Sequence, residues 1–551
     1  MDKKSLIAII LIGLLWGGYF IIFKPEQPKK KAEAIKTETK KQEPAEKAGT
    51  APAPVSIVTY NAGGAEKQVT VQTKKLDVTL STRGAAVSAC RYKERNVDLT
   101  VRNNPFGARG TLDFALHFDD DEFLNSGGLE QALWNYRGEG NTVTFSSDVR
   151  INNSPVRIEK TYTFPEDGLG FTIEYRIINR GGSAVVFKNG EIIVSPGDLL
   201  GPELDYSNTY NRLMSIYSLN GSFKKADKKG GGFLGCGSSS GGETLKKESG
   251  KIDWAGIMSR YFLVIMIPEG SAGKGVVFDN RKQAGFRTGM YVEAAPIAPG
   301  KEFRKTFKVY LGEKDKKALA ATDKSIIDAA DINKLIEPIR KFVIWCLLSI
   351  NKLVGNLGWA LVIFSLLSKA VFMPLTIKST ESMKKMQQLT PKLNELKVKY
   401  KDKPDQMQKE MMKLYRENKV NPMGGCFPLL LQMPFFFALY SALIDSIDLW
   451  RAPFILWMKD LSMPDTVLTI SGFDLNILPI IMTASTFLQQ KLTTVDTGGQ
   501  QKVMMMMMPL VFIFIFWSMP SGLVLYWALQ NIFQIAHQLF INYRSKGKEA
   551  A

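Results

Sequence analysis

Histidine and cysteine are scarce in this chain of 551 residues. The sequence holds two His and four Cys, and no two cysteines are spaced as CxxC. Metal sites and catalytic triads that depend on histidine are therefore not expected, and neither is a disulfide framework. No GxxxxGK[ST] motif is present, since GSAGKG at 270–275 has the wrong spacing. We expect no metal, no cofactor and no catalytic residue, and hence a protein that is not an enzyme.

Acidic residues are outnumbered by basic ones. Lys and Arg total 71 against 53 Asp and Glu, which gives a net charge of +18. This excess predicts an anionic partner, either lipid headgroups or nucleic acid, and the position of the charge must decide between them. The mean hydropathy of −0.06 is typical of a soluble protein, but it averages over strongly clustered apolar residues.

The first apolar cluster runs from Leu6 to Phe23, after a pair of lysines. About 18 residues rise by roughly 27 Å in a helix, close to the thickness of a bilayer core. A cleavable signal peptide is the competing interpretation, but its apolar core is shorter and ends at an A-x-A-like site, which does not follow here. We therefore predict a transmembrane anchor at residues 1–23 that starts in the cytoplasm. Residues 24–54, rich in Lys, Glu, Pro and Ala, are predicted to be a disordered linker.

The pattern from residue 55 to residue 325 is that of β-strands. Apolar and polar residues alternate in QVTVQTKKLDVTL, in GFTIEYRII and in FRKTFKVYL. Period-2 runs separated by Gly, Asn and Asp clusters are typical of half-buried antiparallel strands. We predict one large all-β sandwich domain.

After Asp331 the composition becomes that of membrane helices. Residues 332–355 combine basic side chains with an apolar body, which fits an amphipathic helix in the membrane interface. Five apolar stretches follow within residues 356–545, and with the anchor they predict six transmembrane helices. The five stretches are 357–375, 427–444, 473–490, 503–519 and 522–541.

Loop charges indicate how these helices are oriented. Residues 376–425 hold twelve Lys/Arg and six Asp/Glu, residues 445–474 hold two and five, and the short tail 546–551 is basic again. By the positive-inside rule the first loop and the tail are cytoplasmic. Both termini are then cytoplasmic, and residues 24–340 lie across the membrane.

The segment 378–420 is predicted to be a cytoplasmic coiled-coil hairpin. Apolar residues recur at spacings of 3 and 4 on both sides of a KDKP turn. One interpretation is a solvated hairpin that merely sets topology. The other is a docking arm for ribosomal RNA, lipid headgroups or another protein, whose Met residues favour adaptable contacts.

One charge stands inside the second predicted span. Lys369 would cost about 2.5–3.5 kcal/mol there on insertion scales, so it needs a reason. Its helix face also carries Ser365, Ser368 and Thr376. Snorkelling to the cytoplasmic interface is one explanation, although a rise of roughly 13 Å exceeds the length of a Lys side chain. The other explanation is a water-filled cavity in the cytoplasmic half of the membrane.

The last predicted span also has a polar face. Gln530, Asn531, Gln534 and Gln538 follow Trp527 on one side of this helix. These amides could join helices to one another, at about 0.6 kcal/mol each. Alternatively, they form the second wall of one hydrated groove that also contains Lys369.

Three strings resemble the YidC family of membrane protein insertases: NPMGGCFPLLLQMPFFFALY at 421–440, FMPLTIKSTESMKKM at 372–386 and MPSGLVLYWALQN at 519–531. The resemblance covers 335–545 closely. By architecture it implies the Gram-negative form, with a periplasmic β-supersandwich at 55–325. The structural positions that carry the family pattern are Pro374, Asn421, Pro422, Gly424, Gly425, Pro428, Gln432, Pro434, Pro520 and Gly522.

The resemblance also implies a function. Members of this family insert and fold nascent proteins in the inner membrane, alone or beside the Sec translocon, without their own ATPase. The implied partners are nascent membrane proteins, the Sec translocon, anionic lipids, and the ribosome and signal-recognition machinery through the hairpin, with no DNA.

The family's groove residues map onto this chain by register. Its positive charge maps onto Lys369, where Arg is more common, and the residue one turn earlier maps onto Ser365. The substrate-contacting aromatic pair maps onto Tyr526 and Trp527, where the second is often Tyr. The implied mechanism draws an acidic substrate tail into a hydrophilic groove, after which the apolar segment leaves sideways into lipid.

Three rival functions remain open at this stage. An ion-coupled transporter would use Lys369 as a relay, but the sequence shows no internal repeats. A hydrolase would use a dyad of Ser365 and Lys369, which stand four residues apart. The β domain could instead be a sugar-binding or epimerase-like module, although no acid–base pair stands out in it.

Overall fold

The computed structural model describes residues 57–59, 64–100, 112–125, 128–202, 213–226, 245–271, 273–279, 287–330, 335–400, 403–418, 427–470, 473–493 and 500–549. The predicted anchor and linker at 1–54 lie outside these residues. So do Asn421, Pro422, Gly424 and Gly425 of the family pattern.

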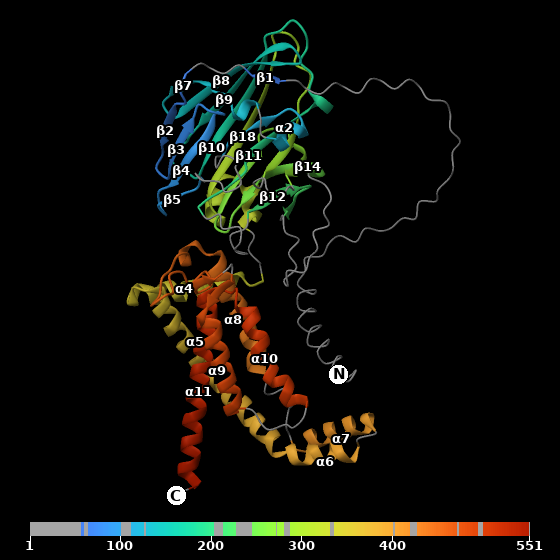
Figure 1. The fold of residues 1–551 in the computed structure, drawn as a ribbon, viewed down its shortest axis with the longest axis vertical. Coiled ribbons are helices and arrows are strands. Elements are labelled where there is room, and N and C mark those ends of the chain that lie inside the picture. Colours follow the sequence, from blue (N-terminus) through green and yellow to red (C-terminus); the bar gives the residue numbers. More distant parts are fainter. Residues whose placement is uncertain are drawn as a thin grey trace, which may run out of the picture. The chain divides into compact units, whose positions relative to one another are not determined.

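The first part of the described chain is an all-β domain, as predicted (Figure 1). All of its strand pairs are antiparallel, and short helices interrupt the strands. The strands are β1 (Ile57–Thr59), β2 (Gln68–Gln72), β3 (Leu76–Ser81), β4 (Ala86–Tyr92), β5 (Val97–Asp98), β6 (Leu116–His117), β7 (Asn135–Glu139), β8 (Thr142–Ile151), β9 (Ser154–Thr163), β10 (Gly170–Asn179), β11 (Glu191–Gly197), β12 (Met214–Leu219), β13 (Ser222–Ala226), β14 (Leu245–Met258), β15 (Phe262–Pro268), β16 (Gly273–Asp279), β17 (Thr288–Glu293) and β18 (Glu302–Glu313). The short helices are α2 (Asp120–Asn125), η1 (Gly128–Glu130), η2 (Lys188–Gly190), α3 (Lys316–Thr322) and η3 (Lys324–Ala330).

The strands form a large and a small sheet. Within the described residues the large sheet has 14 strands in the order β1-β8-β9-β10-β18-β15-β14-β16-β17-β11-β6, with β7, β12 and β13 attached beside this path. The small sheet has the order β2-β3-β4-β5. One large hydrophobic core joins residues of both sheets, and a small separate cluster is formed by Phe123, Ile193 and Val277.

The register of the central strands explains this core. In β10 the residues Phe171, Ile173, Tyr175 and Ile177 are buried, and their neighbours in sequence are less so. Ile173 pairs with Phe307 of β18, which is buried on the same face. The alternation predicted from GFTIEYRII is therefore confirmed, because successive side chains in a strand point to opposite faces.

The second part of the described chain is mainly helical (Figure 1). Its elements are α4 (Glu337–Val354), α5 (Leu357–Gln388), α6 (Thr390–Lys399), α7 (Pro404–Glu417), α8 (Phe427–Asp445), η4 (Ile447–Leu449), β19 (Thr466–Ile470), β20 (Phe473–Asn476), α9 (Ile477–Thr493), α10 (Gln500–Phe516) and α11 (Ser521–Glu549). A second apolar core joins α4, α5, α8, α9, α10 and α11.

Among the described residues, one helix is long and apolar enough to cross a bilayer by length and composition. It is α5, in its segment Leu357–Ser379 of 23 residues. The helices α9 and α10 have 17 residues each, about 26 Å of rise. The six predicted spans are thus not confirmed as a set.

Two apolar stretches differ from their predicted extents. The stretch predicted as a span from residue 473 begins as strand β20, and its helix starts at Ile477. Short apolar runs do not distinguish strand from helix, and a neighbouring run, Thr466–Ile470, supplies a partner strand. The final helix α11 continues to Glu549, through most of the predicted tail at 546–551.

A set of contacts, here called the junction, joins the β domain to the helical part. Arg260, just before β15, donates from Nε to the carbonyl of Ile444 at 2.9 Å and from an Nη atom to the carbonyl of Ser462 at 2.8 Å. Trp450 contacts Tyr261 and Phe262, with ring centroids 5.3 and 5.8 Å apart. Because Arg260 is buried, its guanidinium connects the β domain firmly to the end of α8 and to the segment that follows this helix.

Candidate functional site

A cluster of polar side chains lies where α5, α9 and α11 meet within the apolar helical core. We call it the polar cluster and define it by the residues that hydrogen bonds connect. Its members are Ser365, Ser368 and Lys369 of α5, Ser485 and Thr486 of α9, and Gln530, Asn531 and Gln534 of α11.

The contact between Lys369 and Gln534 is the shortest link between α5 and α11 in the polar cluster. The Lys369 ammonium donates to the side-chain Oε1 of Gln534 at 2.6 Å. Gln534 is buried and Lys369 is partly buried. A side-chain amide is a neutral acceptor, so it orients the ammonium without compensating its charge.

A second link runs one turn earlier. Gln530 donates from Nε2 to the backbone carbonyl of Ser365 and to the hydroxyl of Ser368, each at 3.0 Å. The two serines donate to carbonyls of their own helix, Ser365 to Leu361 and Ser368 to Ser365. Such bonds allow hydroxyls in an apolar helix without an unpaired donor.

A third link connects α11 with α9, and the sequence did not predict it. Asn531 donates from Nδ2 to the hydroxyl of Thr486 at 2.7 Å and to that of Ser485 at 3.1 Å. The only signal in the sequence was the run of hydroxyl residues in an otherwise apolar stretch. The structure therefore places Asn531 on a different neighbour from Gln530 and Gln534.

The predicted aromatic pair is divided between two environments. Tyr526 is buried, and its hydroxyl accepts a hydrogen bond from Nε2 of Gln432 on α8 at 3.0 Å. Trp527 instead packs against aromatic rings of α8 and α10, with its centroid 5.3 Å from that of Phe436 and 5.5 Å from that of Phe516. Gln432, predicted only as a structural position, thus contacts a predicted groove residue.

The remaining predicted positions include Thr376 and three prolines. Thr376 donates to the carbonyl of Phe372 on its own helix at 3.0 Å. Pro374 and Pro434 lie inside α5 and α8. Pro428 lies in the first turn of α8.

Pro520 and Gly522 belong to the start of α11. Pro520 is buried and immediately precedes this helix. The backbone N–H of Gly522 donates to the carbonyl of Leu461 at 2.9 Å, and a Cβ at this position would lie 3.0 Å from the same oxygen. A larger residue at this position would need the Leu461 carbonyl and the Leu443 side chain to shift by a few tenths of an ångström.

The geometry does not favour the rival hydrolase, which would use a dyad of Ser365 and Lys369. A serine nucleophile would donate its proton to the amine. Here the Ser365 hydroxyl donates to the Leu361 carbonyl, and the Lys369 ammonium donates to Gln534.

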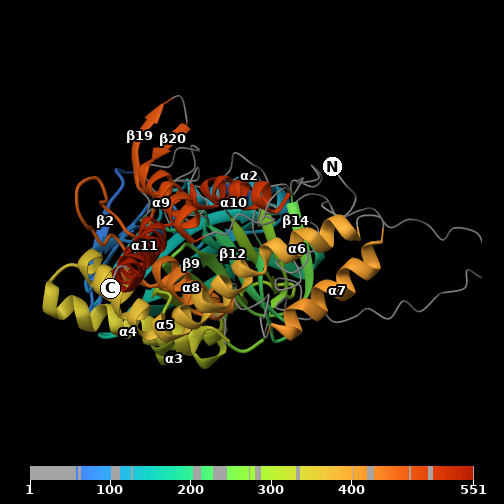
Figure 2. The ribbon, with the colours of Figure 1, turned by 90° about the horizontal axis from the view of Figure 1, so that it is seen from below.

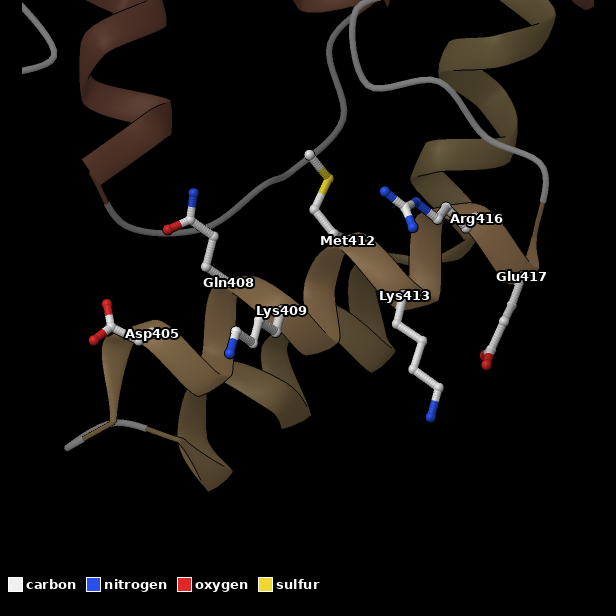
Figure 3. A pocket seen from close by; sticks show the side chains of 7 residues that line it. All are labelled: Asp405, Gln408, Lys409, Met412, Lys413, Arg416 and Glu417. Atoms are coloured by element: carbon white, nitrogen blue, oxygen red, sulfur yellow. The ribbon is translucent and has the colours of Figure 1, made fainter.

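The helices α6 and α7 pack through a small apolar cluster. Leu389 and Leu393 contact Met411, Leu414 and Tyr415 of α7. Side chains of α7 line a hollow of about 710 Å³, shown in Figure 3. The residues that line it are Asp405, Gln408, Lys409, Met412, Lys413, Arg416 and Glu417. The lining combines three cations (Lys409, Lys413 and Arg416), two carboxylates (Asp405 and Glu417) and the exposed Met412.

The β domain contains a buried ionic cluster that sequence reasoning missed. Arg287 donates to Glu130 at 2.9 Å and Asp113 at 3.2 Å, and also to Asp198. Burial raises the pKa of Asp113, and the charge of Glu130 raises it further, while Arg287 opposes both. Burial also lowers the pKa of nearby Lys160 to about 7.

These partners come from distant parts of the chain, so no local motif could reveal them. Arg287 and Asp113 stand 174 positions apart in the sequence. Breaking such a buried pair leaves an uncompensated charge, which is strongly destabilising. We therefore expect the ion pairs of Arg287 to stabilise the folded β domain.

Two family models match the chain. The model described as 60Kd inner membrane protein matches residues 349–549, which contain the polar cluster. The model described as YidC periplasmic domain matches residues 68–337, which are the all-β domain.

Curated proteins are similar over nearly the whole chain. The membrane protein insertase YidC of Pelobacter propionicus is 31% identical, and the alignment covers 98% of this chain and 99% of that protein. The protein of the same name from Geobacter sulfurreducens is 32% identical, with 98% of each chain covered.

Proposed function

The chain belongs to the YidC family of inner membrane proteins, and we propose that it inserts and folds nascent membrane proteins in the inner membrane. Its curated relatives are named membrane protein insertases. The all-β domain corresponds to the family's periplasmic domain. The proposal concerns how the helical part performs insertion.

The observation that carries the proposal is the hydrogen bond of Lys369 with Gln534. It holds a cation where α5 and α11 meet beside the apolar helical core. A charge within a membrane segment is costly unless water or a partner compensates it. We infer a hydrated groove in the cytoplasmic half of the membrane, lined by Ser365, Ser368, Thr376, Gln530 and Gln534.

This groove would lower the barrier in a physical way. A short polar tail of the substrate could enter it and keep hydrogen-bond partners, which bare hydrocarbon cannot supply. The stretch of bilayer that the tail must cross without partners becomes shorter. Lys369 would attract acidic residues of the tail, and the amides of Gln530 and Gln534 would replace water.

Release into lipid would follow from the apolar surface beside the groove. Leu366, Leu367 and Val371 of α5 are exposed next to the polar cluster. A substrate helix that slides past them loses contact with water and gains contact with lipid. Burial of apolar surface contributes roughly 25 cal/mol per Å², so a single span gains many kcal/mol without ATP.

The proposed topology has six spans and both termini in the cytoplasm. The helix α5 meets the length and composition of a span. The helices α8, α9, α10 and α11, with the anchor at 1–23, would complete the set, and α4 would lie in the interface. Residues 24–340 would be periplasmic, in agreement with the name of the matching family model.

We propose a binding place for each partner. The basic surface of α7, with Lys409, Lys413 and Arg416, would meet the ribosome, the signal-recognition machinery or anionic lipid. The Sec translocon would meet the chain within the membrane. No DNA is involved in this scheme.

An ion-coupled transporter is the second candidate. It would use Lys369 as a relay for protons or ions. The names of the curated relatives favour the insertase. Flux of a solute through liposomes that contain the purified chain would favour the transporter.

The decisive experiment depletes the endogenous protein and restores growth with variants. Lys369→Arg should restore insertion of single-span substrates, whereas Lys369→Ala and Lys369→Glu should not. Lys378→Ala, which removes an exposed Lys nine positions later on the same helix, is the matched control and should restore insertion. If Lys369→Ala restores insertion of every substrate tested, a charge in the groove is not needed and the mechanism is wrong.

A further inference from the structure

The strands β19 and β20 form a hairpin that belongs to neither sheet of the β domain. Within the described residues they pair only with each other, in antiparallel register. Figure 2 shows the hairpin projecting from the start of α9. An isolated two-stranded hairpin is marginal in water, so this one needs support from elsewhere.

The pairing register makes the hairpin amphipathic. Residues directly opposite each other in an antiparallel pair place their side chains on the same face. Ile470 pairs with Phe473 and Leu468 with Leu475, so these four share one face. Thr469 pairs with Asp474 on the opposite face, where the Thr hydroxyl donates to the Asp carboxylate at 2.6 Å.

The apolar face is only partly covered by the protein itself, through Leu475 and the contact of Phe473 with Trp517. Leu468, Ile470 and Phe473 are 53%, 59% and 60% exposed. A scattered exposed apolar residue is ordinary, but a sheet face made only of large apolar residues marks an interaction site.

The base of the hairpin is nevertheless firmly attached. The indole N–H of Trp517, just after α10, donates to the Asp474 carbonyl at 3.0 Å, and its ring lies 5.4 Å from that of Phe473. Asn476 donates to the Trp517 carbonyl at 2.5 Å. Asp465 accepts from the backbone N–H of Leu478 at 2.7 Å and so caps α9. The hairpin therefore has a fixed position at the joined ends of α9 and α10.

Exposed apolar residues also lie on those two helices, at the ends nearest to the hairpin. Ile480 and Ile481, in the first turns of α9, are exposed, as is Phe514 near the end of α10. Under the proposed topology these residues face lipid at the periplasmic end of the spans. The hairpin thus extends a lipid-facing surface beyond the helix ends.

We propose that the β19–β20 hairpin is an anchor in the periplasmic membrane interface, with its apolar face on the acyl chains of the outer leaflet. This inference rests on the proposed function. The outer strand edges retain unpaired backbone groups, which hydrocarbon cannot satisfy, so the hairpin lies flat at the headgroup boundary. It does not span the bilayer.

The chemistry of binding is apolar and not electrostatic. Residues 466–476 contain no Lys or Arg, and their one charge, Asp474, lies on the opposite face. Attraction to anionic headgroups therefore contributes nothing. Binding should be insensitive to salt and to the fraction of anionic lipid, unlike that of a basic helix.

The test places a fluorescent probe on each face of the hairpin in the full-length chain. The four native cysteines are replaced by alanine, and Leu468→Cys or Thr469→Cys is labelled with a polarity-sensitive dye. The protein is reconstituted in vesicles of phosphatidylcholine, with or without phosphatidylglycerol. Some lipids carry a nitroxide either near the headgroup or deep in the acyl chain.

The Leu468→Cys probe should show a blue-shifted emission and lose fluorescence to the shallow nitroxide, more than to the deep one. The Thr469→Cys probe should be quenched less by lipid and more by aqueous iodide. Adding Ile470→Glu to the Leu468→Cys variant should reduce the quenching of its probe by the nitroxide lipids. Equal results with and without phosphatidylglycerol complete the expected pattern.

Contrary outcomes separate this inference from the proposed function. A probe at Val371→Cys, on the exposed side of α5, reports whether the helices are embedded at all. If it is quenched by deep nitroxide while the Leu468→Cys probe stays open to iodide, the hairpin is not an anchor and the membrane topology stands. If neither probe is quenched by lipid, both fail. Cross-linking of two chains through the Leu468→Cys position would assign the face to a second copy instead.

Discussion

Lys369 of α5 and Gln534 of α11 are joined by a hydrogen bond of 2.6 Å across 165 positions of sequence. The acceptor, the side-chain amide of Gln534, is neutral. Glu and Leu are close to Gln in size, and they would place an anion or an apolar side chain at the same position. This makes Gln534 the position at which the charge of the polar cluster can be changed without altering the Lys.

Gln534→Glu should reduce insertion of substrates whose translocated tail is acidic. The new carboxylate would pair with Lys369 and compete with the tail for about 1 kcal/mol, roughly a fivefold loss of tail binding. The measurement is protease protection of inserted tails in proteoliposomes. A matched substrate with a neutral tail is the control and should insert as before. Equal loss for both substrates would mean that the variant damages the fold instead.

Asn531 and Thr486 should be energetically coupled. A double-mutant cycle with Asn531→Leu and Thr486→Val would measure the bond between α11 and α9. Hydrogen bonds between membrane helices contribute about 0.6 kcal/mol on average, and we expect a coupling near this value. The readout is unfolding in mixed micelles with increasing denaturing detergent. A coupling of zero would contradict the contact.

Arg260→Ala should loosen the junction. It leaves the carbonyls of Ile444 and Ser462 without this donor in a buried place, which costs about 1–3 kcal/mol. Hydrogen exchange of residues 443–463 should become faster. Arg304→Ala, which removes an exposed ion pair with Glu302, is the matched control and should change stability by about 0–1 kcal/mol. Unchanged exchange after Arg260→Ala would show that the junction does not depend on the guanidinium.

Glu122→Gln should stabilise the β domain at alkaline pH. Burial raises the pKa of the Glu122 carboxyl to about 7, against an unfolded value of 4.5. A carboxyl with a raised folded pKa gives its full contribution to stability below the unfolded pKa, and this is lost as the pH rises through the folded one. Gln cannot ionise and can still accept the Phe118 N–H at 2.8 Å in the wild type.

The advantage of Glu122→Gln over the wild type should therefore grow between pH 5 and pH 8, to about 1–3 kcal/mol. Denaturant unfolding at several pH values measures it. Glu139→Gln, at a side chain 83% exposed, serves as the control for removing a carboxylate. A constant difference across this range would mean that Glu122 does not titrate there.

Features that depend on local periodicity could be predicted from the sequence. The buried face of β10 follows from strict alternation through Phe171 and Ile173, and the shared face of Ser365 and Lys369 follows from helix geometry. The facing amides of α11 follow in the same way. These patterns repeat within one element, so no knowledge of its neighbours is needed.

Features that depend on pairing between elements could not be predicted. Nothing near Asn531 indicates that its partners are Ser485 and Thr486 on another helix. Arg287 collects its carboxylates from three distant segments of the β domain. The stretch from residue 473 resembles a single apolar helix in sequence, because the strand β20 at its start is stabilised by pairing with β19, which lies outside the stretch.

The length of α5 has a mechanical consequence. Its 32 residues rise by about 48 Å, more than the roughly 30 Å of a bilayer core. Lys369 and the start of α6 are thus connected by a continuous helical stretch, which is weakened at Pro374 because proline cannot donate a helix hydrogen bond. A force applied to α6 and α7 would be transmitted to α5 and would bend this helix at Pro374, five residues from Lys369. Docking of a partner on α6 and α7 outside the bilayer would then change the position of the Lys369 ammonium within it.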